Sequence, residues 1–365
     1  MEGIAVVIGG SHHNTLGVIR SLGDQGIKPF VILIDKSNYR SYVSYSKYIN
    51  EYWQVSNSDM AVDTLIAQFS GGEKQKTVVF ACNDEIALKL DESKNKFPLS
   101  FIVPGTIGNI GLNRLMNKQV MAEVAKSVGV SVPKEYNVFS DTIVFPIIAK
   151  PLVSVKGHKT DIAIISDQNE LDTYLKNHSP ENTQFQQYID KEVEFQIIGV
   201  SLGSGDKVII PGVSTILGYC QSSNTAYLKY GYLNDSYEAE KCKRFMKAVG
   251  FNGLFSMEFV RGKDGINYYM ETNFRNDGNG IAVKHAGVNL PYIWFMYNVF
   301  GHYDGVPLQI KKEVKVMPEL QELYFLRSKK ISIKEFVKHL LATNHLMEFS
   351  WKDQRPFWNV ITTRV

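Results

Sequence analysis

Short apolar runs alternate with amphipathic stretches at the start of the chain. Residues 4–8 form a continuous apolar run that ends in Gly9-Gly10, an amphipathic stretch covers about 15–25, and a second apolar run covers 29–34. Continuous apolar runs of this length are typical of strands that a sheet buries on both faces. The pattern therefore predicts a strand–helix–strand unit with parallel strands.

The same alternation continues to about residue 115. A helix is predicted over 59–69 and a strand over 77–80, and the polar residues Cys82-Asn83-Asp84-Glu85 follow that strand. Strands that alternate with helices in this way indicate a doubly wound parallel sheet. We therefore predict a Rossmann-like domain over residues 1–115.

The first turn of this domain, Gly9-Gly10-Ser11-His12-His13-Asn14, lacks the GxGxxG spacing of a dinucleotide site. Asp35 lies at a suitable distance for a ribose contact, but a tight turn that needs glycine explains the sequence better than NAD binding. Ligands of open parallel sheets gather at the carboxyl ends of the strands. Ser11, His12 and Asp84 could therefore line a pocket for another ligand, although two adjacent histidines are more typical of a loop.

From residue 116 onward the pattern becomes one of separate strands and helices. Asn117 is a suitable N-cap for an amphipathic helix that ends at Gly129, and the apolar strand 145–149 ends abruptly at Lys150-Pro151. We also expect strands over 162–165, 183–200 (broken near Asp190) and 253–273 (a hairpin), and helices over 168–177, 236–249, 285–299 and 333–341. These elements predict an α+β region after the first domain.

The hairpin has a definable register. Asp264-Gly265 is a preferred dipeptide for a two-residue type I′ turn, which would pair Lys263 with Ile266. Counting outward from that turn places Glu258 directly opposite Glu271. Directly opposed residues have Cβ atoms about 5 Å apart.

Two carboxylates this close repel each other unless a cation compensates. Strand alternation puts Asn273 on the same face as Glu271, so the hairpin offers the oxygen ligands that Mg²⁺ prefers. Magnesium usually completes its shell with water and phosphate, which would imply a nucleotide. An ordinary surface hairpin with exposed acids explains these residues about equally well.

Composition bounds the class of protein. The 365 residues exceed one ordinary core and indicate two or three domains. The net charge of +3, from 40 basic and 37 acidic residues, gives no electrostatic footprint for nucleic acid or a membrane surface. The three cysteines are widely spaced and the sequence shows no basic signal-peptide region or membrane-spanning run, so we expect a cytoplasmic protein.

Several short sequence motifs resemble those of the ATP-grasp superfamily and occur in the same order as in that family. Met257-Glu258-Phe259 and Met270-Glu271-Thr272-Asn273-Phe274-Arg275 are similar to that family's paired metal-binding strands. Asn117-Lys118 is similar to the opening of its ATP-grasp domain, with Asn in place of Asp. The segment 145–151 is similar to its strand ending in Lys-Pro, and Gln186-Gln187-Tyr188-Ile189 with Glu194 to its adenine-binding hinge. The resemblance covers about residues 1–305.

The resemblance implies a role for each matching residue. Glu258, Glu271 and Asn273 would be the ligands of Mg²⁺, with Mn²⁺ as an alternative metal, and Arg275 would stabilise the transferred phosphate and the acyl oxygens. Lys118 and Lys150 would bind ATP phosphates. A lysine at the end of an apolar strand is rarely left without an anionic partner. The alternatives are that Lys150 simply reaches solvent and that Lys118 is exposed.

The remaining nucleotide contacts are where the chain departs from the family. Gln186, Gln187 and Ile189 would contact adenine, although an acid is common at the first of these positions. The family's glycine-rich phosphate loop has only Gly157 here, so fewer backbone groups could hold the phosphates. Ser154, His158 and Lys159 are therefore the candidates in this segment for contacting them. Glu194 is our choice for the ribose contact, with Glu192 as the competitor.

The resemblance implies a domain order and a reaction. The Rossmann-like domain 1–115 would precede an ATP-grasp fold of two α+β subdomains, 116–185 over the phosphates and 186–305 with the metal and acceptor sites, and then a C-terminal extension, 306–365. The chain most resembles carbamoyl-phosphate-synthetase-like carboxylate–amine ligases, which phosphorylate a small-molecule carboxylate with ATP and join it to an amine.

Other readings stay open at this point. They are a small-molecule kinase, a nucleotide-binding protein without turnover and, less favoured, a biotin carboxylase. A homodimer is compatible with this class of enzyme. Lys284 and His285 could face the substrate cleft, although we favour His285 as a residue that simply starts a helix.

Overall fold

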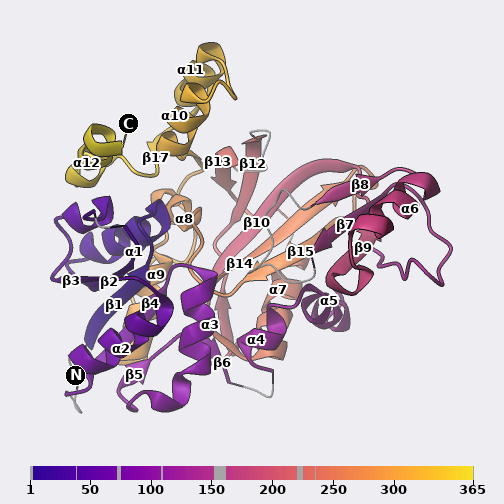
Figure 1. The fold of residues 1–365 in the computed structure, drawn as a ribbon. Helices are drawn as coiled ribbons and strands as arrows, with labels where there is room; N and C mark the ends of the chain where they lie inside the picture. Colours follow the sequence, from indigo (N-terminus) through magenta and orange to yellow (C-terminus); the bar gives the residue numbers. More distant parts are fainter. Residues whose placement is uncertain are drawn as a thin grey trace.

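The computed structural model describes residues 3–37, 39–71, 75–107, 110–151, 162–219, 225–234 and 236–364. Within these ranges the chain forms a five-stranded, a three-stranded and a nine-stranded sheet (Figure 1). The first is parallel and the second antiparallel, and the third is antiparallel except for one pair. No helix in this described part of the chain has both the length and the apolar character needed to cross a bilayer.

The N-terminal sheet has the order β3-β2-β1-β4-β5. Its strands are β1 Gly3–Gly9, β2 Phe30–Ile34, β3 Tyr52–Val55, β4 Lys76–Ala81 and β5 Phe101–Ile102. β1 pairs in parallel with both β2 and β4, which confirms the predicted strand–helix–strand unit. The sequence pattern missed β3, because YWQV is too short and too mixed to stand out.

Helices α1 (His13–Gly23), α2 (Ser58–Phe69) and α3 (Asp84–Glu92) belong to this sheet. α1 begins earlier than the predicted residue 15, because His12 is its N-cap and its Nδ1 accepts a hydrogen bond from the Asn14 N–H at 3.2 Å. Asp84 opens α3 directly after β4. The first turns of α1 and α3 therefore lie at the carboxyl edge of neighbouring strands.

The three-stranded sheet has the order β8-β7-β9. Its strands are β7 Ile147–Pro151, β8 Ala163–Ile165 and β9 Thr183–Gln187, and α6 (Gln168–Asn177) packs against β8. The helix α5 (Lys118–Ser127) packs instead against β15 (Asn267–Asn273) of the largest sheet. The predicted cap of α5 is confirmed, since Asn117 Oδ1 accepts from the Gln119 N–H at 2.9 Å. A small core that includes Ile147, Ala149 and Phe185 holds this sheet together.

The largest sheet runs β15-β14-β10-β12-β13-β16-β17, with β11 beside β10 and β6 beside β14. Its bounds are β6 Gly105–Thr106, β10 Lys191–Leu202, β11 Lys207–Ile209, β12 Val213–Tyr219, β13 Thr225–Gly231, β14 Phe251–Gly262, β15 Asn267–Asn273, β16 Val314–Met317 and β17 His345–Leu346. Helix α7 (Ser236–Val249) was predicted with these bounds. Phe195, Met257 and Phe259 make one face of this sheet apolar.

The hairpin β14–β15 has the predicted register but not the predicted turn. Gly262 N donates to Ile266 O at 2.9 Å and Gly265 has φ of 79°, so the loop has three residues and ends in a left-handed glycine. This loop shifts the pairing by one residue. A bulge between Glu258 and Phe259 in the ladder restores it, so that Glu258 still pairs with Glu271.

The single helix predicted over 285–299 is wrong. The chain forms α8 (Gly280–Ala286) and α9 (Leu290–Phe300), separated by Gly287 with φ of 116° and by the N-cap Asn289. His285 therefore lies in the last turn of α8 and does not start a helix. Its ring stacks on the ring of His345, and the two ring centroids are 4.1 Å apart. Lys284 Nζ donates to Arg20 O at 3.0 Å, so it ties α8 to α1.

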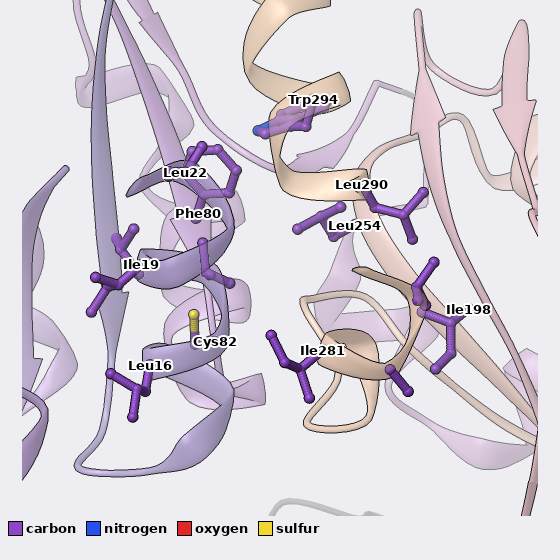
Figure 2. Close-up of a cluster of buried hydrophobic side chains, with 14 of the residues drawn as sticks. Leu16, Ile19, Leu22, Phe80, Cys82, Ile198, Leu254, Ile281, Leu290 and Trp294 are labelled. Atoms are coloured by element: carbon purple, nitrogen blue, oxygen red, sulfur yellow. The ribbon is translucent and has the colours of Figure 1, made fainter. Parts of the chain in front are cut away.

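α8 and α9 pack between the parallel sheet and the large sheet. Figure 2 shows Leu16, Ile19 and Leu22 of α1 and Phe80 of β4 on one side of these helices. Ile198 of β10 lies on the other side. Since one apolar cluster contains side chains from all of these elements, the two sheets share a core and hold a fixed relation to each other.

The C-terminal residues return to both sheets. β16 pairs with β13 and β17 pairs with β16, which extends the large sheet. Helices α10 (Glu319–Arg327), α11 (Ile333–Ala342) and α12 (Arg355–Arg364) accompany them, and α10 and α11 project from the body of the molecule (Figure 1). Arg20 of α1 binds Asp353 across a buried 3.0 Å ion pair, so this segment also contacts the N-terminal sheet.

Candidate functional site

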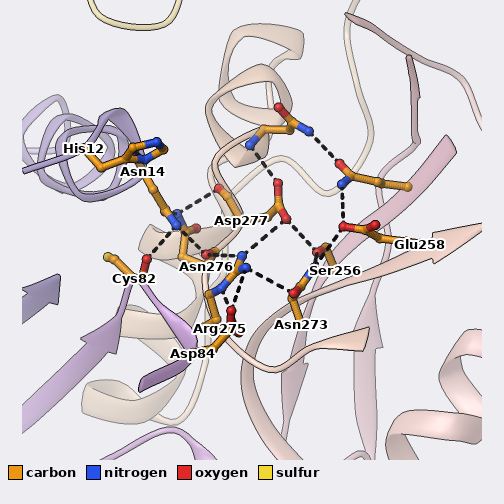
Figure 3. Close-up of polar contacts among 12 residues, drawn as sticks. His12, Asn14, Cys82, Asp84, Ser256, Glu258, Asn273, Arg275, Asn276 and Asp277 are labelled. Carbon is orange, nitrogen blue, oxygen red and sulfur yellow. Dashed lines mark hydrogen bonds and ion pairs between the residues drawn. The ribbon is translucent and has the colours of Figure 1, made fainter. Parts of the chain in front are cut away.

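Polar side chains gather on one face of the β10–β14–β15 ladder. Glu258 pairs directly with Glu271, and Ser256 pairs with Asn273. Asn273 Nδ2 donates to Glu258 Oε1 at 3.1 Å, which places these two side chains on the same face (Figure 3). The hairpin therefore brings together the three residues predicted from the sequence as metal ligands.

A residue that sequence reasoning missed holds Glu258 from the other side. Gln196 pairs with Glu258 across β10 and β14, and its Nε2 donates to Glu258 Oε1 at 3.0 Å. Gln196 Oε1 in turn accepts from Asn279 Nδ2 at 2.7 Å. In the sequence, a glutamine within an apolar strand was the feature that could have marked Gln196 as a functional residue. Its partner Glu258 became visible only through the pairing of β10 with β14.

Arg275 joins the hairpin to the N-terminal sheet. Its guanidinium donates to both carboxylate oxygens of Asp84, at 3.1 and 3.2 Å, and to Asn273 Oδ1 at 3.1 Å (Figure 3). Nη1 also lies 3.4 Å from Asp277 Oδ2. Burial alone would lower the pKa of Arg275, but Asp84 and Asp277 outweigh it and hold the pKa above its ordinary value. Arg275 is therefore a fixed cation beside the carboxylate face.

The loop after β15 is locked onto the first turn of α1. Asn14 Nδ2 donates to Cys82 O and to Asn276 O, both at 2.8 Å. Asp277 accepts from Ser256 Oγ at 2.8 Å and from the Asn279 N–H at 2.8 Å. The carboxyl edge of β1 and β4 thus meets the end of β15, as expected for a ligand site between the two sheets.

Lys150 is a buried cation at the end of β7, with a relative exposure of 9%. Burial and, to a smaller degree, Lys118 lower its pKa, while Glu271 and Glu135 raise it, and together they bring the pKa from 10.5 to about 8. These influences show that Lys118, at the first position of α5, and Glu271 of β15 both lie near it. Among the described residues, no carboxylate lies within ion-pair distance of Lys150 or Lys118.

The side chain opposite Lys150 also has unused hydrogen-bonding capacity. Gln184 pairs with Lys150 across β7 and β9, and its Nε2 donates to Glu135 Oε1 at 2.5 Å. Its buried Oε1 has no hydrogen-bond partner among the residues described. A buried lysine without an ion pair and a buried oxygen without a donor are costly unless a polar ligand occupies the site.

The predicted hinge connects the small sheet to the large one. Gln186 pairs with Ile148 on β7 and is buried, and the Gln187 N–H donates to Lys134 O at 2.8 Å. Ile189 lies between β9 and β10. No group in the described part of the chain accepts a hydrogen bond from its backbone N–H.

Glu194 and Glu192 differ in the face they occupy. Glu194 pairs with Val260, so it shares the face of Gln196 and Glu258. A ladder irregularity follows Lys191, and Glu192 lies 3.7 Å from Arg261, whose strand position faces the other way. The geometry therefore favours Glu194 as the acid that a ligand on this face would meet.

Two of the predicted phosphate contacts, Ser154 and Lys159, lie outside the described residues, as do Gly157 and His158. Ser11, His12 and Asp84 lie at the edge of the N-terminal sheet. Ser11 Oγ accepts from Ser41 Oγ at 2.9 Å, whereas Asp84 binds Arg275.

The residues present fit a hydrated magnesium ion with phosphates. Two carboxylates and an amide oxygen suit a hard cation that keeps water and phosphate ligands. Asn273 Oδ1 accepts one hydrogen bond from Arg275, and an amide oxygen has a second lone pair to offer a metal. No cluster of three or more His, Cys, Asp or Glu side chains suited to a metal occurs in the described residues.

Neither a family model nor a curated protein matches the sequence. Solved structures do match the fold. An N5-carboxyaminoimidazole synthetase from Staphylococcus aureus has a TM-score of 0.68 and 18% identity, over 92% of this chain and 86% of that one. An L-amino acid ligase from Bacillus licheniformis has a TM-score of 0.62 and 14% identity, over 86% and 79%.

A third similar structure was determined with nucleotide. The biotin carboxylase domain of the Hydrogenobacter thermophilus 2-oxoglutarate carboxylase, in complex with MgADP, ADP and bicarbonate, has a TM-score of 0.65 and 17% identity, over 85% of this chain and 73% of that one. The matches extend over 85–92% of this chain at 14–18% identity, so they show a shared fold. The chain therefore has the ATP-grasp fold.

Proposed function

We propose that the protein is an ATP-dependent ligase that activates a small-molecule carboxylate as an acylphosphate and joins it to an amine. The observation that carries this proposal is the unpaired, buried Lys150 beside the carboxylate face of the β14–β15 hairpin. Such a cation is stabilised by phosphate, and the hairpin acids are suited to the metal that accompanies phosphate.

The nucleotide lies between the two ATP-grasp subdomains in this proposal. Lys118 and Lys150 neutralise phosphate oxygens. Ser154 and Lys159, which lie outside the described residues, are the further phosphate contacts that the sequence motifs imply. The hinge contacts adenine through Gln186, the backbone of Gln187 and the Ile189 N–H, and Glu194 accepts from the ribose. These groups fix the γ-phosphate in line with the acid.

Glu258, Glu271 and Asn273 would hold Mg²⁺, or Mn²⁺ in its place. When bound, the metal polarises the phosphates and offsets their charge. Gln196 keeps Glu258 aligned, which is the role of an outer hydrogen-bond donor at a metal site. These residues orient the γ-phosphate toward the edge where Arg275 lies.

Arg275 stabilises the charge that develops on the transferred phosphate and on the tetrahedral intermediate. Asp84 and Asp277 hold the guanidinium in place from both sides. The acid and the amine bind between this arginine and the first turns of α1 and α3. The similar structures include an L-amino acid ligase and two N5-carboxyaminoimidazole synthetases. The names of these enzymes support amide-type chemistry.

The nucleotide site is tested by thermal shift. Glu271→Gln should abolish the rise in melting temperature that Mg²⁺ and ATP give to the wild-type protein. The substitution keeps the size of the side chain and removes the negative charge that would bind the metal. Glu240→Gln, the same change in an exposed ion pair on α7, is the matched control and should keep the full shift. An unchanged shift in Glu271→Gln would refute the assignment of the metal site.

The reaction is tested by ADP release against a panel of carboxylates, with and without amines. We expect ADP release that depends on both an acid and an amine, with amide as the product. ADP release with one substrate and a stable phosphorylated product would instead identify a kinase. Nucleotide binding without release for every pair would leave a binding protein. Light scattering of the same samples measures whether the protein forms the homodimer compatible with this class.

A further inference from the structure

Helix α11 carries an exposed apolar face that has no role in the proposed reaction. Four aliphatic side chains recur at the spacing of one helical face and are exposed: Ile333, Val337, Leu340 and Leu341. Ile333 and Leu341, near the two ends of the helix, are 72% and 81% exposed. Single exposed apolar residues are common, but four on one helical face form a patch of the kind that marks a contact surface.

The opposite face of α11 fixes the helix to the rest of the molecule. His339 Nδ1 lies 3.0 Å from Glu322 Oε2 of α10, and the His339 ring also packs on Tyr227 of β13, with centroids 4.7 Å apart. Ser332 and Glu335 form a capping box at the start of the helix. The apolar face therefore points away from the body, at the end of the molecule where α10 and α11 project (Figure 1).

Lysines surround this face. Between Tyr324 and Leu341 the chain has five basic residues and one acidic residue, a net charge of +4, whereas all other residues together sum to −1. Four exposed lysines belong to this stretch: Lys329, Lys330, Lys334 and Lys338. Among the described residues, no carboxylate lies within ion-pair distance of any of them. The nearly balanced charge of the whole chain therefore hides one strongly basic end.

A hollow of about 630 Å³ opens where α10 turns into α11, and its lining includes Lys329, Lys330, Ile331 and Ile333. Lys329 follows the C-cap of α10 and has φ of 57°, a left-handed conformation in which glycine is unstrained and lysine is not. A lysine at a position that favours glycine places a cation at this hollow at a cost in stability. Strain of this kind is typical of a functional site.

We propose that the α10–α11 hairpin docks the protein on an anionic lipid surface. The aliphatic side chains of α11 enter the headgroup region, and Lys334 and Lys338, which border them along the helix, remain at the level of the phosphates. Lys329 and Lys330 bind a headgroup phosphate at the hollow. Basic clusters beside the apolar face of an amphipathic helix are typical of binding to anionic lipids. This surface is separate from the ligase site and does not depend on the proposed reaction.

Two other occupants fit this face less well. A second copy of the chain would bring the same lysines against one another, with only Glu335 to offset them, so like charges would repel. Interfaces between proteins are enriched in aromatic residues and arginine and depleted in lysine, the reverse of what α11 presents. A lipid surface needs no matching shape and accommodates a projecting helix.

Co-sedimentation of the full-length protein with vesicles tests the proposal. We expect wild-type protein to bind vesicles of phosphatidylglycerol and phosphatidylcholine in equal parts at least about 10-fold more tightly than vesicles of phosphatidylcholine alone. Added salt should weaken the binding, because it screens the lysines. Ile333→Ser with Leu341→Ser should weaken it at least about 10-fold. Lys334→Gln with Lys338→Gln should weaken it about 25-fold, since each lysine near an anionic surface contributes about 5-fold.

Lys329→Gly separates folding from binding. Glycine adopts the left-handed conformation without strain, so the melting temperature should stay the same or rise, while vesicle binding should fall about 5-fold. Leu99→Ser, at an exposed position before β5, and Lys126→Gln, on α5, are matched controls that should bind vesicles as the wild type does. The thermal shift with Mg²⁺ and ATP should stay unchanged in every variant, so docking and nucleotide binding are measured separately.

Several outcomes would overturn the proposal. They are wild-type protein that sediments with neither type of vesicle, equal binding to both types, and undiminished binding after Ile333→Ser with Leu341→Ser. Light scattering without vesicles tests the second copy as occupant. A dimer that the same double substitution abolishes, in a protein that binds no vesicles, would assign this face to self-association instead.

Discussion

At the scale of single residues, Lys150 shows how the site uses an interaction that folding alone would disfavour. The side chain is almost fully buried at the end of β7, and no described carboxylate forms an ion pair with it. A buried charge of this kind lowers the free energy of unfolding of the free protein, and binding of an anion raises it again. The sequence signalled this residue, because a lysine directly after an apolar strand is unusual.

Lys150→Met should therefore stabilise the free protein and abolish the thermal shift with Mg²⁺ and ATP. The pKa of Lys150 falls from 10.5 to about 8, so below pH 8 the folded protein bears the whole cost of the buried charge. At about 1.4 kcal/mol for each unit, this cost is roughly 3 kcal/mol. The gain from the substitution should be largest below pH 8 and should shrink as the pH rises toward 10.5.

Melting temperatures of the free and nucleotide-bound protein at pH 7 and pH 9.5 measure this. Lys126→Met, the same change at an exposed position of α5, should alter neither the stability nor the shift. A Lys150→Met protein that is less stable than wild type at pH 7 would show that the cation is already compensated in the free protein.

At the scale of elements, backbone geometry decided what side-chain patterns left open. The apolar stretch 285–299 has helical character throughout, yet Gly287 ends α8 in a positive φ and Asn289 starts α9. The hairpin count gave the correct facing pair, Glu258 and Glu271, although its turn was wrong, because the loop and the bulge shift the pairing in opposite directions. Neither correction can be read from hydrophobic periodicity.

Gly287→Ala should destabilise the protein by about 2 kcal/mol, since a non-glycine residue in a left-handed conformation costs about 1–2 kcal/mol. Its φ is 116°, and a Cβ there would lie 3.0 Å from Lys311 Cγ. Gly301→Ala is the matched control, because Gly301 ends α9 with φ of 81° and has open space around it. Chemical denaturation should show a smaller loss, about 1 kcal/mol, for Gly301→Ala. Equal losses at both positions would contradict the role given to Lys311.

At the scale of the whole molecule, the C-terminal segment fastens the two sheets together. Arg20 donates to Asp353 Oδ2 at 3.0 Å, to Asp353 O at 2.7 Å and to Glu348 O at 2.8 Å. Asp353 also accepts from Ser46 Oγ at 2.8 Å. Glu348 of this segment also contacts α1, because its Oε1 lies 3.1 Å from His13 Nδ1. The C-terminal segment is thus held to α1 at two places.

Asp353→Asn should lower the stability of the protein by about 3–5 kcal/mol, because it leaves the buried Arg20 charge uncompensated. Thermal unfolding measures the loss. Asp304→Asn, in an exposed pair with His302, should change the melting temperature little. Replacing both partners, as Arg20→Met with Asp353→Leu, should recover part of the loss; no recovery would mean that the charge is not its cause.

The sequence by itself determined the fold class, most helices and strands, and the hairpin face with Glu258, Glu271 and Asn273. These follow from local periodicity, capping residues and turn residues, which act over a few neighbours. Only the tertiary structure decided the contacts of Gln196, Asp84 and Asp277 around this face. It also brought Lys118, Lys150 and Glu271 near one another, and joined His13 to Glu348. Such contacts depend on strand order and on the packing of distant segments, for which a single sequence carries no periodic signal.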